Sequence, residues 1–355
     1  MSGPHLPGPP LPTPPSPPHR ERRENVVAVC IVTHNSASDV PGCMEAIAAF
    51  QHRPLEIVVV DCASQDGSLE AARRHAPVGI PFQAVALAEN LGFAGGMNAA
   101  LARTQAPFIL TLNADARPAP DYVTRLLELA QSHRAGAVTG RLVRPSLDRQ
   151  PRRLDACGMF LIPSWRHLDR GSGEVDHGQW SEPEKVFGAT GAASLFRREA
   201  LDDVAVEGEI FDPRFHSFRE DAELCFRLRE RGWEVLYEPA AVAEHRRFNL
   251  PERRGAMPPM VNRHSLKNRY LLRIYHQTAG NLVRTFFPTL IRDLAALGYV
   301  LLRERSSLGA YAWLWQHRSE LLNRRRQIQG RRTVPAREVD RWFFVQGESL
   351  QEESR

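Results

Sequence analysis

Closely spaced cysteines are absent from this sequence, and lysine is rare. The five cysteines stand at scattered positions without a CxxC pair, which excludes a zinc cage or a disulfide framework and favours buried free thiols in a reducing compartment. Lysine occurs only as Lys185 and Lys267, so nearly all of the 46 basic residues are arginine. The glycine- and lysine-containing signature of a P-loop is absent, which argues against a P-loop NTPase.

The sequence also lacks an uninterrupted apolar run that would cross a membrane. The most apolar stretch, residues 282–302, contains Arg284, Pro288, Arg292 and Asp293, too many polar breaks for a hydrocarbon span. Its apolar residues recur at helical spacing with arginines between them, which predicts an amphipathic helix.

Proline and charge are distributed unevenly. Nine prolines among the first 19 residues predict a disordered or polyproline-like terminus with no signal peptide. Residues 246–355 carry 21 of the 46 basic residues but only nine of the 41 acidic ones, although the net charge is +5. Such a basic end predicts contact with nucleic acid or anionic lipid. In chain order we expect a proline-rich disordered segment, a catalytic domain, an arginine-rich amphipathic helical region and a polar tail: residues 1–24, 25–261, 262–334 and 335–355.

Four short apolar segments, rich in β-branched residues, predict strands buried on both faces of a parallel sheet. They cover residues 26–32, 56–61, 82–87 and 108–112. Helical patterns between them indicate βαβ units and an α/β fold. Because ligands of such sheets bind beyond the carboxyl ends of the strands, the residues after each strand are the candidates for function.

All four strand ends are polar. Asp61 can accept the N3–H of uracil or thymine, and residues 90–98 open a helix with glycines, whose backbone N–H groups could approach a diphosphate. The spacing of these glycines differs from the dinucleotide fingerprint. Each polar end alone is ordinary turn chemistry, but four at one sheet edge favour a nucleotide pocket.

Three further positions carry carboxylate or imidazole chemistry. Asp115 after the fourth strand could hold Mg²⁺ or Mn²⁺ beside a diphosphate, or it could cap the next helix. Glu220 and Asp221 begin a helical pattern, as dipole partners or with one carboxylate as general base. His245 ends the following strand and is either structural or a metal ligand.

Together these segments resemble family 2 glycosyltransferases of the GT-A fold, with bacterial rhamnosyltransferase-like members the most similar. The resemblance is carried by residues 32–36, 60–68, 90–98, 113–115, 188–192, 220–221 and 245, and covers roughly residues 26–275. It implies a Rossmann-like, mostly parallel central sheet flanked by helices, with a C-terminal helical extension. It also implies a nucleotide-sugar site formed by Thr33, Asn35, Asp61, Ser64, Asp66, Asn90, Gly92, Phe93, Gly95, Asn98, Asn113 and Ala114.

The same resemblance implies an inverting transfer from a nucleotide-diphosphate sugar, dTDP-rhamnose or a UDP-sugar, to a hydroxyl of a cell-envelope or lipid-linked glycan. Asp221 would be the catalytic base, with Glu220 as the alternative, and Asp115 and His245 would hold Mg²⁺ or Mn²⁺. The sugar and acceptor cleft would be lined by Gly188, Ala189, Gly191 and Ala192. Two positions depart from the family pattern: Cys62 stands for Asn or Asp, and Ala114 for Pro.

Two other functions are open to a sequence of this kind. A nucleotidyltransferase of the same fold would need a glycine- and lysine-containing loop after the first strand, and residues 33–40 contain neither. A non-catalytic protein could bind nucleic acid or a partner through its basic tail, but the arginines alternate with apolar residues as in an amphipathic helix, so we expect no nucleic acid partner.

The helical region 262–334 has two interpretations. It could simply pack on the catalytic core, or it could lie at a membrane surface as a helix pair, residues 282–302 and 308–322. The two can coexist, and lipid-linked acceptors would explain a membrane contact. We therefore expect a cytoplasmic enzyme that is peripheral on the inner face of the plasma membrane.

Overall fold

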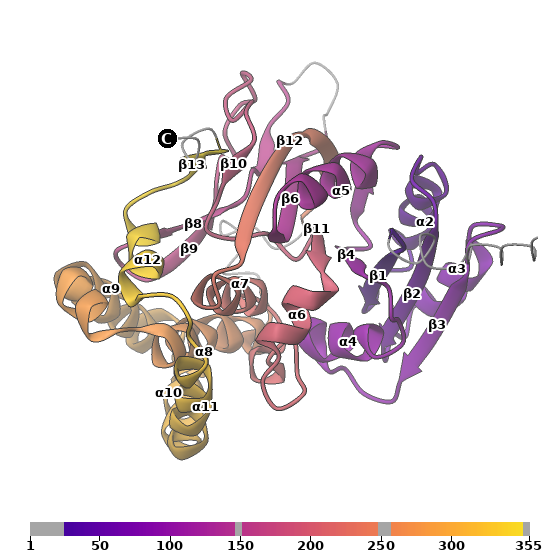
Figure 1. The fold of residues 1–355 in the computed structure, drawn as a ribbon. Helices are drawn as coiled ribbons and strands as arrows, with labels where there is room; N and C mark the ends of the chain where they lie inside the picture. Colours follow the sequence, from indigo (N-terminus) through magenta and orange to yellow (C-terminus); the bar gives the residue numbers. More distant parts are fainter. Residues whose placement is uncertain (1–24, 146–150, 248–256, 351–355) are drawn as a thin grey trace, which may run out of the picture.

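The centre of the molecule is one large mixed sheet with helices on both faces (Figure 1). The computed structural model describes residues 25–145, 151–247 and 257–350, so the proline-rich terminus predicted over residues 1–24 lies outside the described residues. The strand order is β13-β10-β12-β6-β11-β4-β1-β2-β3, with β5 beside β12 and β7 beside β6. The arrangement confirms the α/β fold expected from the sequence.

The first half of the sheet is parallel and consists of the four predicted strands. They are β1 (Val27–Thr33), β2 (Leu55–Cys62), β3 (Phe82–Leu87) and β4 (Phe108–Leu112). Strand β1 lies between β2 and β4 and is almost wholly buried, because its alternate apolar side chains pack against helices on both faces. The flanking helices are α2 (Val40–Ala48), α3 (Ser68–Arg74), α4 (Gly92–Leu101) and α5 (Tyr122–Ser132).

The second half of the sheet is mixed. Strand β11 (Ala193–Arg197) runs antiparallel to both β4 and β6 (Ala135–Val143). Strand β12 (Glu234–His245) runs parallel to β6, and its end pairs with β5 (Ala116–Pro118), so that His245 lies opposite Ala116. The shorter elements here are β7 (Leu154–Ala156), β8 (Met159–Ile162), β9 (Arg166–Asp169), β10 (Glu184–Lys185), α6 (Arg198–Val204) and α7 (Glu220–Glu230).

Two glycines allow the start of α4 to approach its neighbours closely. Gly92 has a φ of +68°, and a Cβ at this position would lie 2.3 Å from the carbonyl oxygen of His216. A Cβ on Gly96 would lie 2.6 Å from Val32 Cγ1 on β1. Larger residues would therefore push the helix away from the sheet edge that β1 and β2 form.

The C-terminal helices pack mainly against one another, and α12 also contacts α7. They are α8 (Pro259–His276), α9 (Ala279–Arg303), α10 (Leu308–Gln316), α11 (Arg318–Gly330) and α12 (Ala336–Asp340). The prediction of one helix over residues 308–322 is wrong, because the chain turns at His317 and divides it into α10 and α11. The segment expected as a polar tail buries Trp342 and Phe343, each 1% exposed, and adds β13 (Glu348–Ser349) to the sheet.

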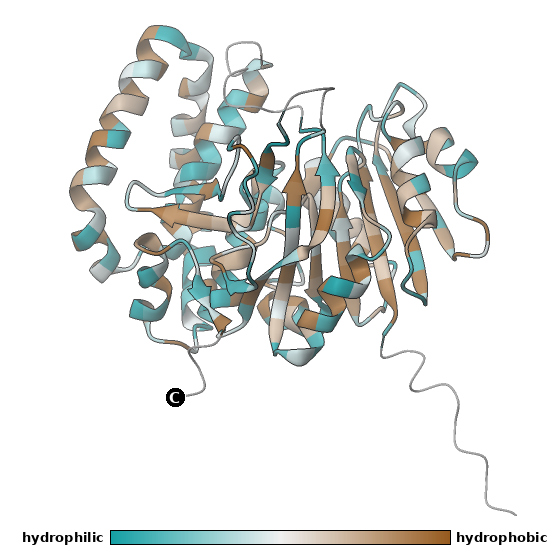
Figure 2. Ribbon diagram, turned by 90° about the horizontal axis from the view of Figure 1, so that it is seen from above, coloured by the Kyte–Doolittle hydropathy of each residue, from teal (hydrophilic) through white to brown (hydrophobic). Residues whose placement is uncertain are grey.

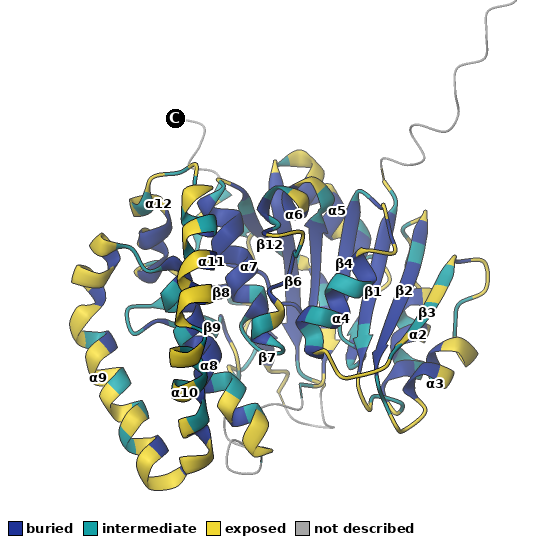
Figure 3. Cartoon of the chain, turned by 90° about the horizontal axis from the view of Figure 1, so that it is seen from below, coloured by how far each residue is buried: buried dark blue, intermediate teal, exposed yellow. Residues whose placement is uncertain are grey.

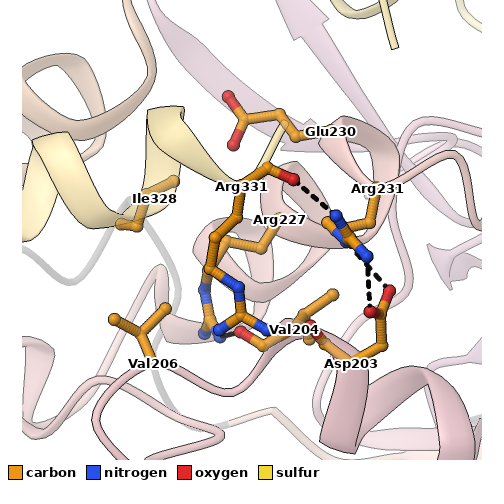
Figure 4. A pocket seen from close by; sticks show the side chains of 8 residues that line it. All are labelled: Asp203, Val204, Val206, Arg227, Glu230, Arg231, Ile328 and Arg331. Carbon is orange, nitrogen blue, oxygen red and sulfur yellow. Dashed lines mark hydrogen bonds and ion pairs between the residues drawn. The ribbon is translucent and has the colours of Figure 1, made fainter. Parts of the chain in front are cut away.

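Figure 4 shows how α11 adjoins the catalytic part of the chain. A small pocket lies between Val204, Arg227 and Ile328, and several charged side chains border it. Arg231 pairs with Asp203 at 2.7 Å and donates to the carbonyl oxygen of Arg331 at 2.6 Å. These contacts attach α11 and the residue that follows it to α6 and α7.

Helix α9 differs from the other helices in leaving many large apolar side chains exposed (Figures 2 and 3). Val283, Phe287 and Leu302 are 78%, 72% and 80% exposed. Among the described residues, α9 is the one helix whose length and hydropathy would suffice to cross a membrane. Its opposite side is fixed to the protein, since Trp165 Nε1 donates to Asn281 Oδ1 at 2.9 Å and Asp293 pairs with Arg269 and Arg273 of α8.

Candidate active site

The nucleoside end of the site lies where β1 and β2 end side by side. The buried Thr33 hydroxyl donates to Asp61 Oδ1 at 2.7 Å, and Ser64 donates to the same oxygen through its hydroxyl at 2.5 Å. The backbone N–H of Ser64 donates to Asp61 Oδ2 at 2.9 Å. Asp61 is thereby held in one orientation at the sheet edge, and its contact with a base stays a prediction.

The loops after β1 and β2 are joined by reciprocal hydrogen bonds. Asn35 donates through its backbone N–H to Ser64 Oγ and accepts from the Gln65 N–H through its side chain, both at 2.9 Å. Asp66 accepts from the Ala37 N–H at 2.9 Å and from the Ser68 hydroxyl. Asn35 and Asp66 therefore shape the rim of this pocket through contacts within the protein.

The glycine-rich segment follows β3 and forms the first turns of α4, as expected. Asn90 Oδ1 accepts from the Gly92 N–H at 2.9 Å, and Gly95 packs directly against Leu91. Phe93 faces the segment 188–192, with its ring 3.2 Å from where a Cβ on Gly191 would be. Asn98 lies deeper, and its side-chain amide bonds to the backbone N–H and C=O of Phe211 at 2.9 and 2.7 Å.

Asp115 and His245 lie together at the ends of β4 and β12. Asp115 Oδ1 is 3.3 Å from His245 Nε2, and Asn113 Nδ2 lies 3.4 Å from the same nitrogen. On the other side of the ring, His245 Nδ1 lies 2.7 Å from Oδ2 of the fully buried Asp155. Such a carboxylate orients an imidazole so that Nε2 is directed at a metal.

This pair suits a divalent cation that also binds a ligand's oxygens. Burial alone would lower the pKa of His245, but its hydrogen bonds to Asp115 and Asp155 raise the pKa to about 9, so a cation would have to displace the proton on Nε2. For Asp115 the directions are reversed: burial alone would raise its pKa, but the adjacent His245 lowers it. Within the described residues no group of three or more His, Cys, Asp or Glu side chains could hold a metal, so a diphosphate and water would have to complete the coordination.

The acidic pair at the start of α7 is divided between two environments. Asp221 is partly exposed and accepts the Gly191 N–H at 3.0 Å and the Ala222 N–H at 2.8 Å, one on each oxygen. Burial raises the pKa of Asp221, mainly through loss of water around the carboxylate. Glu220 is 6% exposed, and burial together with the Asp221 charge holds the pKa of Glu220 well above its usual range.

The segment Gly188–Ala192 connects these groups. The Asn113 N–H donates to the Ala192 carbonyl at 2.8 Å, and Gly191 touches both Phe93 and Asp221. On the other side, the Gly188 carbonyl accepts from Met159, and the Ala189 N–H lies 3.3 Å from Cys225 Sγ. The predicted cleft segment therefore brings together the ends of β4, α4 and α7.

Several site residues were not predicted. Asp155 comes from β7, distant in sequence from His245, and nothing in the sequence connects the two. Arg247 stands two residues after His245 and pairs with Asp155 at 3.1 Å and with Asp169 at 2.6 Å, so a charge next to a candidate ligand was the available signal. Asn268 of α8 is fully buried, and its amide donates to the carbonyls of Phe215, Ser217 and Phe218 just before α7.

The family model for "Glycosyl transferase family 2" matches residues 28–205, half of the 355-residue chain. The chain belongs to glycosyltransferase family 2. This glycosyltransferase is rhamnosyltransferase-like: it is 24% identical over 242 residues to the N-acetylglucosaminyl-diphospho-decaprenol L-rhamnosyltransferase of Mycobacterium tuberculosis, covering 62% of this chain and 76% of that one.

Two further likenesses belong beside it. An N-acetylglucosaminyltransferase of Azorhizobium caulinodans is 29% identical over 233 residues, covering 61% of this chain and 54% of that one. Among solved structures, the fold is similar to a mannosyltransferase of Pyrobaculum calidifontis in complex with GDP-Man and Mn²⁺, with a TM-score of 0.51, 21% identity and coverage of 82% and 75%. The glycosyltransferase therefore has a GT-A fold, as the sequence predicted.

Proposed function

We propose that this glycosyltransferase moves a sugar, with inversion, from a nucleotide-diphosphate donor to a hydroxyl of a cell-envelope or lipid-linked glycan. One observation carries the proposal: the segment Gly188–Ala192 joins the two charged groups, because Gly191 donates to Asp221 and Ala192 accepts from Asn113, next to the Asp115–His245 pair. The name of the mycobacterial relative supports rhamnose as the sugar and a lipid diphosphate glycan as acceptor, and we propose dTDP-rhamnose as donor. A UDP-sugar is the alternative donor.

The donor would lie along the carboxyl edge of the sheet. Asp61 would accept from the base, the rim of Asn35 and Asp66 would surround the nucleoside, and the start of α4 would direct backbone N–H groups at the diphosphate. A divalent cation, Mg²⁺ or Mn²⁺, held by Asp115 and His245 would offset the charge of the departing diphosphate. Asp155 would keep the His245 ring directed at that cation.

Asp221 is the proposed base. Each of its oxygens already accepts one backbone N–H, which fixes the carboxylate and leaves room for an acceptor hydroxyl. That hydroxyl would give its proton to Asp221 as its oxygen bonds to the anomeric carbon and the bond to the diphosphate breaks. The raised pKa of Asp221 makes it a stronger base than an ordinary exposed aspartate. Glu220 is buried and suits a supporting role.

Helix α9 supports a peripheral membrane position. Its outer side presents Val283, Phe287 and Leu302, while the arginine-rich segment that follows offers charge for anionic headgroups. A lipid-linked acceptor would be reached from this surface. The proposed location is the cytoplasmic face of the plasma membrane, where nucleotide sugars are available.

A panel of nucleotide sugars tests the donor assignment. Thermal shifts would be measured for dTDP- and UDP-sugars with Mn²⁺, with Mg²⁺ and with EDTA, followed by hydrolysis of the best binder. We expect one nucleotide class to stabilise the enzyme only with metal, and Asp61→Ala to abolish that shift. Equal shifts with and without metal would contradict the proposed cation site.

A further inference from the structure

A second anionic site lies beside the base. An open cavity of about 930 Å³ is bordered by the β8–β9 hairpin, the loop before α7 and helices α8 and α9. Six arginines line it against two carboxylates, Asp169 and Glu174. The arginines are Arg144, Arg153, Arg166, Arg219, Arg247 and Arg292. None of the described residues assigned above to the nucleotide or the cation lines this cavity.

The carboxylates of the cavity do not neutralise its arginines. Arg247 pairs with Asp169 at 2.6 Å, and both Arg247 and Arg144 also pair with the buried Asp155 outside the lining, at 3.1 and 3.7 Å. Arg153 donates to the Gly173 carbonyl at 2.7 Å. Arg166 and Arg219, by contrast, have no carboxylate within 4.0 Å in the three described ranges. A surplus of positive charge therefore faces the interior of the cavity.

Arg219 carries its charge in a partly buried position. Its guanidinium contacts His167 Nδ1 at 3.1 Å, and burial together with nearby arginines holds the pKa of His167 well below its usual range, so the ring is neutral. Burial and the charges of Arg269 and Arg166 lower the pKa of Arg219 to about 10. The charge of Asp221 offsets part of this repulsion, and an anion bound here would offset more of it.

The cavity joins the base to the exposed apolar helix. Arg219 stands two residues before Asp221, so the backbones of the two lie within about 7 Å. At the other side, Arg292 belongs to α9, whose outer side chains are apolar. A ligand that fills the cavity would thus have its reacting end near Asp221 and its other end at the proposed membrane surface.

We propose that this cavity binds the phosphate of a lipid-linked acceptor. Arg166, Arg219 and Arg292 hold the phosphate oxygens, the glycan hydroxyl faces Asp221, and the lipid leaves along α9. Guanidinium groups suit this role because their planar donors match phosphate oxygens. The inference rests on the proposed function and names its acceptor class.

Farnesyl diphosphate serves as the probe and is titrated into the full chain. EDTA is present so that the diphosphate cannot bind through a metal ion at the Asp115–His245 pair instead. We expect saturable binding that weakens about tenfold to a hundredfold in Arg166→Gln and Arg292→Gln, the loss of a charge-assisted contact. Arg303→Gln, an exposed arginine of the same helix outside the cavity, should stay within about twofold of the wild type. Farnesol should bind at least tenfold more weakly.

Three results would overturn the inference. If farnesyl diphosphate binds both Arg166→Gln and Arg292→Gln as tightly as the wild type, these arginines do not bind the ligand. If farnesol binds as tightly as farnesyl diphosphate, the phosphates do not contribute to binding. If inorganic pyrophosphate binds as tightly, the lipid does not contribute. Binding of the donor nucleotide with Mn²⁺ should be the same in these variants as in the wild type. If the wild type itself does not bind a donor nucleotide with Mn²⁺, that result counts against the proposed function instead.

Discussion

His245 depends on a partner that no sequence pattern places beside it. Asp155 is fully buried, 2.7 Å from His245 Nδ1, and its second oxygen lies 3.1 Å from Arg247. The ring is therefore oriented before any ligand binds. A carboxylate in this position typically matters to metal affinity almost as much as the ligands themselves.

Asp155→Asn should weaken Mn²⁺ binding by about 10- to 100-fold, because the amide removes the charge behind the imidazole. The measurement is the Mn²⁺ concentration that half-activates donor hydrolysis. Asp176→Asn is the matched control, since Asp176 pairs with Arg141 and does not touch His245. An unchanged Mn²⁺ requirement in Asp155→Asn would show that the ring needs no such orientation.

Among the elements, helix α9 has more exposed apolar side chains than a purely structural role would require. Asn281 and Asp293 fix one side to the protein, and the opposite side leaves large apolar groups in water. Exposing such a surface has a cost that burial in a lipid headgroup layer would remove.

The double variant Val283→Glu/Phe287→Glu should lose at least tenfold in binding to phosphatidylglycerol vesicles at low salt. Each large apolar side chain contributes roughly 1.5–3 kcal/mol when it leaves water. The melting temperature should stay unchanged, since both side chains are largely exposed. Val78→Glu, at an exposed valine before β3, is the control. Vesicle binding that survives in the double variant would contradict a membrane role for α9.

Helix α8 supports the site from a distance. Asn268 donates to three carbonyls of the segment 215–218, where His216 and Phe218 have positive φ angles of 61° and 71°. Non-glycine residues in this conformation cost free energy, so the buried amide holds the segment in place. The C-terminal helices therefore help to position the proposed base as well as cover the core.

At the scale of the whole molecule, a buried ionic cluster joins the catalytic domain to the C-terminal helices. Glu223 of α7 pairs with Arg227 at 2.7 Å and lies 3.6 Å from His276 of α8, which reaches Glu230 at 3.2 Å. Glu230 in turn pairs with Arg332 beyond α11. Loss of one member would leave buried charges without compensation.

Glu223→Gln should lower the free energy of unfolding by about 3–5 kcal/mol. Burial alone would raise the pKa of Glu223, but Arg227 and His276 lower it from 4.5 to about 2. Stability from this carboxylate is thus present above pH 4.5 and lost as the pH falls toward 2.

The same cluster acts in the opposite direction at alkaline pH. Although burial opposes its charge, Glu230 and Glu223 raise the pKa of His276 above 6.5, so this contribution is present below 6.5 and lost as the pH rises through the folded value. The free energy of unfolding of the wild type, measured with urea at each pH, should decline on both sides, and the acid slope should be shallower in Glu223→Gln. An acid slope equal to that of the wild type would contradict the cluster's role.

The strands and strand-end residues could be predicted because apolar β-branched runs and polar turns are local features. That is why the sequence places Asp61 and Asp115 at or just after the ends of strands and Asp221 at a helix start, where the structure has them. Asp155, Asn268 and the arginine cavity depend on contacts between segments far apart in the chain, which no local pattern encodes. The burial of Trp342 and Phe343 beneath a polar-looking tail has the same cause.

The most direct test of the account is Asp221→Asn, measured for donor binding and for turnover of the nucleotide sugar. Asparagine keeps an oxygen for the Gly191 N–H but cannot take a proton, so donor affinity should be unchanged while turnover falls by about 10²–10⁴-fold. Glu220→Gln should reduce turnover far less. Near-wild-type turnover in Asp221→Asn would contradict the central claim that this carboxylate is the base.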